Sequence, residues 1–138
     1  MAVGFKVGNI IEEIGTQDFL HAFFSTVSHH LEPAGWGARY PELMLQLYQG
    51  KLNTKDAPKA LKDILEIRER LKAFSPKEVV WDIEDLTAKP PWGNNISSEI
   101  TDLSNYFVTS TGKDLFEVLI ECLEDLQEEG GDLTIETI

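Results

Sequence analysis

The residues best placed by type and spacing to act together are acidic. Glu117, Glu121, Glu124 and Glu128 fall within a narrow arc of a predicted helix, at about 100° per residue, with Asp125 at its edge. Like charges at i,i+4 each cost a few tenths of a kcal/mol, and anions are disfavoured at the C-terminal end of a helix. The pattern is consistent with a solvated helix face or with a surface that binds a basic partner, and the sequence leaves both open.

A second acidic pair could bind a divalent ion or exchange protons with a substrate. Asp82 and Glu84 share one face of a predicted strand, opposite Val79, Trp81 and Ile83. A solvated strand face explains the same residues, and we favour that interpretation.

The histidines offer little for catalysis. His21 and His29 lie about 12 Å apart on a helix, too far to share one ion. We predict that they face solvent. Thr111-Gly112-Lys113 resembles the end of a phosphate-binding loop, but position 107 is Phe where that loop needs Gly, so a helix cap is the better interpretation.

No other catalytic motif is present, and we predict no catalytic residue, no metal site and no cofactor. Neither a Gly-x-Ser-x-Gly elbow, a His-Glu-x-x-His helix nor an EF-hand loop occurs. Cys122 is the single cysteine, so the chain has no intramolecular disulfide and no thiolate cluster. We expect an inert thiol in the core.

Length and charge narrow the choice of partner. The chain has 138 residues and a formal net charge of -12, which fits one domain over residues 1–138. A strongly anionic surface repels nucleic acid and anionic membranes and favours a basic partner. No secretory signal or transmembrane stretch is recognisable, so the default location is cytoplasmic.

Hydrophobic periodicity predicts an α+β domain, with a sheet of about four strands covered by about four helices in the order β-α-α-α-β-β-α-β. The strand order is not predictable from this pattern. The expected strands are 3–7, 79–83, 105–109 and 133–138; the expected helices are 16–31, 41–50, 54–71 and 115–129, with a short helix over 96–103 and a loop over 84–95.

Two tryptophans fall in predicted loops. Trp36-Gly37 and Trp92-Gly93 could each plug the edge of a core or anchor an interface. Core packing is the commoner role.

Several stretches together resemble a known family. They are DFLHAFFSTVS (18–28), WGARYPELM (36–44), VVWDIEDL (79–86), PPWGNNIS (90–97) and LSNYFVTSTGKDLFEVL (103–119). The chain thereby resembles the immunity protein 70 family of bacterial polymorphic toxin systems. This resemblance implies a small cytoplasmic α+β protein that binds and neutralises a cognate toxin domain, and it implies no catalytic residues.

Our hypothesis is that an acidic surface contacts the toxin, which could be a nuclease with a basic cleft. The residues concerned are Glu117, Glu121, Glu124, Asp125, Glu128, Asp82, Glu84 and Trp92. Two alternatives stay open: a small-ligand protein or enzyme that uses loop 84–95 as a lid, and an acidic regulatory module. The toxin and the oligomeric state are not predictable from the sequence.

Overall fold

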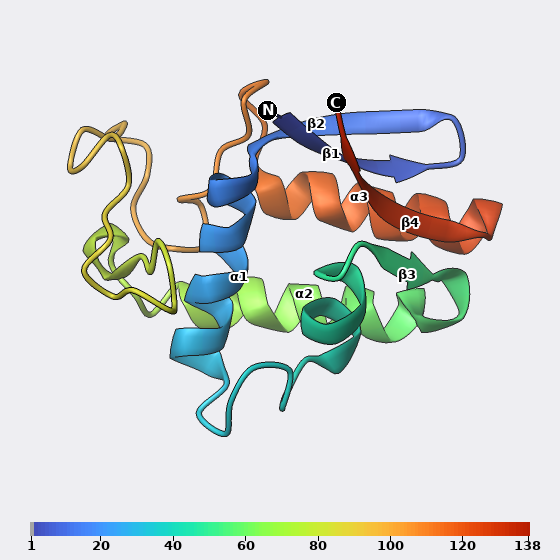
Figure 1. Cartoon of the computed structure of the whole chain (residues 1–138), viewed down its shortest axis with the longest axis horizontal. Helices are drawn as coiled ribbons and strands as arrows, with labels where there is room; N and C mark the ends of the chain where they lie inside the picture. The colour runs from blue at the N-terminus through green and yellow to red at the C-terminus, as the bar shows by residue number, and fades with distance from the viewer. Residues whose placement is uncertain (1) are drawn as a thin grey trace.

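The two ends of the chain meet in one antiparallel sheet. The computed structural model describes residues 2–138, and its strands are β1 (Ala2–Val7), β2 (Ile10–Thr16), β3 (Lys51–Asn53) and β4 (Asp132–Thr137). Their order is β2-β1-β4-β3, so β1 and β4 lie side by side with the two chain ends together (Figure 1). The predicted α+β class is confirmed, and β1 and β4 match two of the predicted strands.

β1 and β2 form a hairpin, and β2 is not among the predicted strands. The turn is Gly8-Asn9, and Gly8 has a φ of +58°, a conformation that glycine adopts without steric cost. β2 itself gives no period-2 signal, because Ile10 and Ile11 are adjacent and a bulge interrupts the register opposite Val3 and Gly4.

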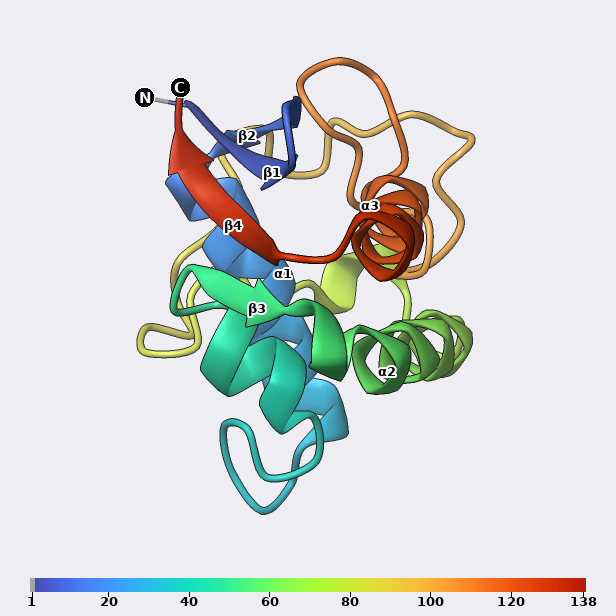
Figure 2. The same ribbon diagram turned by 90° about the vertical axis from the view of Figure 1, so that its right-hand side faces the viewer.

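Three long helices pack beneath and across the sheet. They are α1 (Gln17–Leu31), α2 (Ala57–Leu71) and α3 (Leu115–Glu129), joined by the short η1 (Glu42–Leu47, a π-helix), η2 (Thr54–Asp56) and η3 (Pro76–Glu78). Thr16 caps α1 by accepting a 3.1 Å hydrogen bond from the Phe19 N–H. Asp114 caps α3 by accepting one of 2.8 Å from the Phe116 N–H. Figures 1 and 2 show α1 crossing the roughly parallel α2 and α3.

A cluster of aromatic rings lies at the centre of the core. The ring of Phe23 meets Phe24, Phe107 and Phe116 edge-on, with centroids 5.3–5.4 Å apart. Inward-facing residues of β1 join this core, and Cys122 is buried in it as predicted. Burial raises the pKa of that thiol to about 12, so the buried Cys122 is expected to be unreactive.

The predicted strand over 79–83 is wrong. The segment bends at Trp81 and enters a turn at Ile83, and its backbone pairs with side chains of α1 instead of another strand. The buried hydroxyl of Thr26 accepts a 3.0 Å hydrogen bond from the Val80 N–H and donates a 3.2 Å bond to the Val80 carbonyl. Ser25 accepts a bond of 3.2 Å from the Ile83 N–H. These buried polar residues of α1 therefore take the place of a strand edge.

Two further predictions are wrong. Segment 105–109 forms no strand, and only an isolated bridge joins Val108 to Asp114. Tyr106 and Phe107 are buried in the core, which explains their strand-like character. Residues 96–103 form turns instead of a helix, and the missed β3 pairs with β4.

Candidate functional site

One side of α3 presents the acidic face, defined as Glu117, Glu121, Glu124, Asp125 and Glu128. The opposite side of the helix buries an apolar arc against β1 and α2. This packing turns the acidic face outward: its four glutamates are exposed and Asp125 is partly buried. The structure thus groups these five residues as the spacing predicts.

Only the N-terminal end of the acidic face is neutralised. Arg68 of α2 places Nη2 3.6 Å from Oε1 of Glu117 and 3.9 Å from Oδ2 of Asp114. Within residues 2–138, no Lys, Arg or His nitrogen lies within 4.0 Å of the other four carboxylates. The part of α3 from Glu121 to Glu128, about two helical turns, therefore carries uncompensated negative charge.

The other three predicted site residues lie elsewhere. Asp82, Glu84 and Trp92 belong to the long connection between η3 and α3, on the opposite side of α1 from the C-terminal end of α3 (Figure 1). The structure therefore separates the predicted residues into two groups.

Asp82 is fixed by two hydrogen bonds. Its Oδ1 accepts one of 2.9 Å from the Glu84 N–H and lies 3.2 Å from Nε2 of His21. The Glu84 N–H and, secondly, His21 lower the pKa of the Asp82 carboxyl below its ordinary value. Glu84 itself is exposed.

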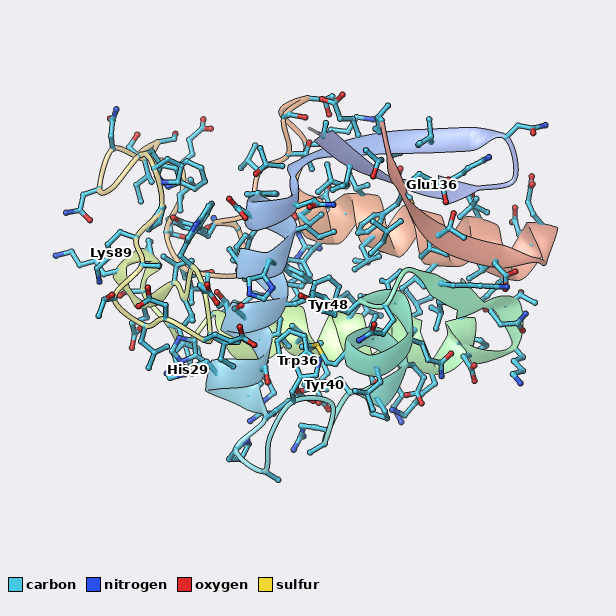
Figure 3. All side chains as sticks on the ribbon, in the orientation of Figure 1. His29, Trp36, Tyr40, Tyr48, Lys89 and Glu136 are labelled. Atoms are coloured by element: carbon cyan, nitrogen blue, oxygen red, sulfur yellow. The ribbon has the colours of Figure 1, made fainter. Side chains whose placement is uncertain are left out.

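His21 continues the network into the protein, contrary to the expectation that it faces solvent. Its Nδ1 lies 2.8 Å from the Tyr48 hydroxyl, and its ring lies near-parallel to Trp36 with centroids 6.4 Å apart. Trp36 and Tyr48 lie beside α1 in Figure 3. The sequence gives no signal for this network, because Tyr48 and Asp82 are 27 and 61 positions away. His29 is exposed as predicted.

A carboxylate, an imidazole and a hydroxyl in a row could in principle activate a nucleophile. Here the hydroxyl is a phenol, and burial, followed by the nearby Glu84 and Asp82, raises the pKa of Tyr48. A phenol that resists ionisation is a poor nucleophile, so the geometry favours a tether between the 79–86 segment and α1.

Trp92 is held within its loop and is also partly accessible. Its Nε1 donates a 2.9 Å hydrogen bond to the Tyr106 hydroxyl, and its ring meets Trp81 edge-on at 5.3 Å. About 36% of the residue is exposed. Trp36, by contrast, donates to the Met44 carbonyl at 2.9 Å and packs on the core.

Loop 84–95 lines part of a crevice of about 740 Å³, formed between segments 75–79 and 89–96 with Tyr106. Across residues 2–138, no three His, Cys, Asp or Glu side chains are grouped so as to hold a metal ion. In the same range, no helix combines the length and apolar character needed to cross a bilayer.

Comparisons with known proteins give one match. No curated protein and no solved structure matches the chain. The family model described as Immunity protein 70 matches residues 5–135, nearly the whole chain, and the predicted resemblance is confirmed. The chain belongs to the Immunity protein 70 family.

Proposed function

We propose that this protein protects a bacterial cell by binding a toxin domain through the acidic face of α3. Membership of the family supports a protein toxin as the partner. The observation that carries the choice of surface is that four of the five carboxylates of the acidic face have no cationic neighbour among residues 2–138. A partner that supplies Lys or Arg would neutralise this charge.

The charge also suggests how the toxin is inhibited. A nuclease binds phosphates in a basic cleft, and a row of carboxylates along a helix can occupy such a cleft and exclude the substrate. Attraction between opposite charges speeds association by about 10–1,000-fold at low ionic strength. Fast capture suits an inhibitor that must act before the toxin does. Asp82, Glu84 and Trp92 form a separate group, which we propose as a secondary contact for a toxin large enough to reach around α1.

A co-expression experiment tests the immunity role. The tagged protein is produced together with the toxin domain encoded beside its gene, and survival and complex formation are measured. We expect survival and a stable complex. Death of the cells and no complex, with a folded protein and an active toxin, would refute the proposal.

A matched pair of variants tests the surface. We expect Glu121→Lys with Glu124→Lys to slow association and to reduce its salt dependence. The control is Glu99→Lys with Glu136→Lys, which changes the net charge equally. Glu99 is exposed and lies outside α3. Glu136 of β4 lies opposite Gly4 of β1. Because the next residue of β1, Phe5, points into the core, the side chain of Glu136 points to the other face of the sheet. Equal association rates for the two double variants would exclude the acidic face as the contact.

A further inference from the structure

The residues that line the crevice between segments 75–79 and 89–96 carry positive charge, opposite in sign to the net charge of the whole protein. Two lysines, Lys77 and Lys89, line it, and none of the described lining residues is Asp or Glu. The nearby carboxylate of Glu78 does not line the crevice and accepts a 2.7 Å hydrogen bond from the Ser75 N–H. The chain as a whole carries 24 acidic residues and 12 Lys or Arg. Figure 3 shows Lys89 on the loop side of α1, far from the sheet.

Neither lysine is neutralised by the protein. No carboxylate among residues 2–138 lies within 4.0 Å of either Lys77 or Lys89, whereas six other Lys and Arg residues form such pairs. Each ammonium group therefore keeps its donors and its charge available for an anion.

The other residues that line the crevice favour an apolar part of a ligand. Pro76, Val79, Pro90 and Ile96 contribute hydrocarbon surface. The volume of about 740 Å³ is within the range of roughly 300–1,000 Å³ that is typical of small-molecule sites. A ligand of this site would thus combine negative charge with apolar surface.

One residue of the lining, Tyr106, carries a hydroxyl group that can donate a hydrogen bond. Tyr106 is only 5% exposed, and its oxygen accepts the hydrogen bond from Trp92. Its own O–H proton has no acceptor among residues 2–138. Burial raises the pKa of Tyr106, which keeps the hydroxyl protonated and able to donate to a carboxylate oxygen.

We propose that this crevice binds an organic carboxylate carried on an apolar or aromatic body, with Lys77 and Lys89 attracting the charge and Tyr106 donating a hydrogen bond. The ligand could be a free acid or the C-terminus of a peptide, which share this chemistry. The site is separate from the acidic face of α3, but its segment 89–96 includes Trp92, which we propose as part of the secondary toxin contact. The binding test below uses the protein alone and therefore does not depend on the toxin.

Titration followed by protein NMR tests this site with 4-phenylbutyrate as the probe and 4-phenylbutanol as the uncharged match. We expect the acid to shift the amide signals of segments 75–79 and 89–96, and the alcohol to bind at least about fivefold more weakly. Equal binding of acid and alcohol, or no shifts at millimolar acid, would overturn the proposal.

Lysine variants test which residues attract the carboxylate of the ligand. Lys77→Gln with Lys89→Gln should weaken binding of the acid about tenfold, whereas Lys55→Gln with Lys62→Gln, two exposed lysines away from the crevice, should leave it unchanged. Equal affinities of the two double variants would overturn the assignment.

The same titration with acetyl-Gly-Phe and its C-terminal amide distinguishes a free organic acid from the C-terminus of a peptide as the ligand. Tighter binding of the peptide acid than of phenylbutyrate supports a peptide terminus as the ligand, and the reverse order supports a free acid. In either case the amide should bind more weakly than the peptide acid, and equal binding of the two peptides counts against the site.

Discussion

Oδ1 of Asp82 lies 3.2 Å from Nε2 of His21, and this contact joins the long connection after η3 to α1. Because the pKa of Asp82 is lowered in the folded protein, its stabilising contribution is complete above the ordinary value of 3.8. The contribution is lost as the pH falls through the lower, folded pKa. Thermal unfolding of the wild type and of Asp82→Asn between pH 2 and 7 should therefore differ most above pH 3.8 and converge in stronger acid. A difference that grows in acid would contradict this assignment.

Thr26 provides the two hydrogen bonds that replace a strand edge. Thr26→Val keeps the side-chain shape and leaves the buried N–H and C=O of Val80 without partners. We expect a loss of about 1–3 kcal/mol in the free energy of unfolding, measured by urea denaturation. Thr26→Ser retains the hydroxyl and should lose about 1 kcal/mol or less. If the serine variant is the less stable of the two, the hydroxyl does not have this role.

Glu32 organises the loop after α1. Its carboxylate is almost fully buried and accepts hydrogen bonds of 3.0 Å from the N–H groups of Gly37, Arg39 and Tyr40. Glu32→Ala should lower the free energy of unfolding by about 2–4 kcal/mol, because buried donors lose a charged acceptor. Glu32→Gln, which keeps one carbonyl acceptor, should fall between alanine and the wild type. Chemical denaturation measures all three, and an alanine variant as stable as the wild type would contradict the prediction.

The acidic face should reduce the stability of its own helix. Glu124→Gln with Glu128→Gln removes an i,i+4 repulsion and two anions near the C-terminal end of α3. We expect a gain of about 0.5 kcal/mol at low salt that shrinks at high salt. Thermal unfolding at two salt concentrations measures this gain. A loss of stability would indicate that these residues have partners within the protein.

Cys122 should resist thiol reagents in the native state. The side chain is buried and the pKa of the thiol is about 12, so little thiolate exists at pH 8. Labelling with a chromogenic disulfide should be slow in buffer and fast in denaturant. Fast labelling in buffer would show that α3 opens readily.

The elements that the sequence predicts well are those whose periodicity is set by a single apolar face. α2 and α3 each bury one apolar arc, and β1 points Val3, Phe5 and Val7 into the core. The hydrophobic periodicity of these elements can therefore be recognised in the sequence. β3 has only three residues, too few for any period to show. The Gly8-Asn9 pair between β1 and β2 is a hairpin signal that was available in the sequence.

Segment 79–83 resembles a strand because apolar and acidic residues alternate along it, but its backbone partners are hydroxyl groups on α1. No local pattern distinguishes a strand neighbour from a helix that presents Ser25 and Thr26. The acidic face was predictable because helical spacing alone creates it. The contact between His21 and Asp82, like the crevice beside Tyr106, depends on tertiary packing and therefore has no signature in the sequence.

The position of β1 in the sheet also determines when the protein can finish folding. β1 and β2 are joined by a two-residue turn, whereas the other edge of β1 pairs with the distant β4, and Val3 lies opposite Thr137. During translation the hairpin must wait with an open edge until residues 132–137 leave the ribosome. Contacts between such distant positions close large loops and slow folding. Until β4 is made, this unpaired edge of β1 is a template on which another chain could pair and aggregate.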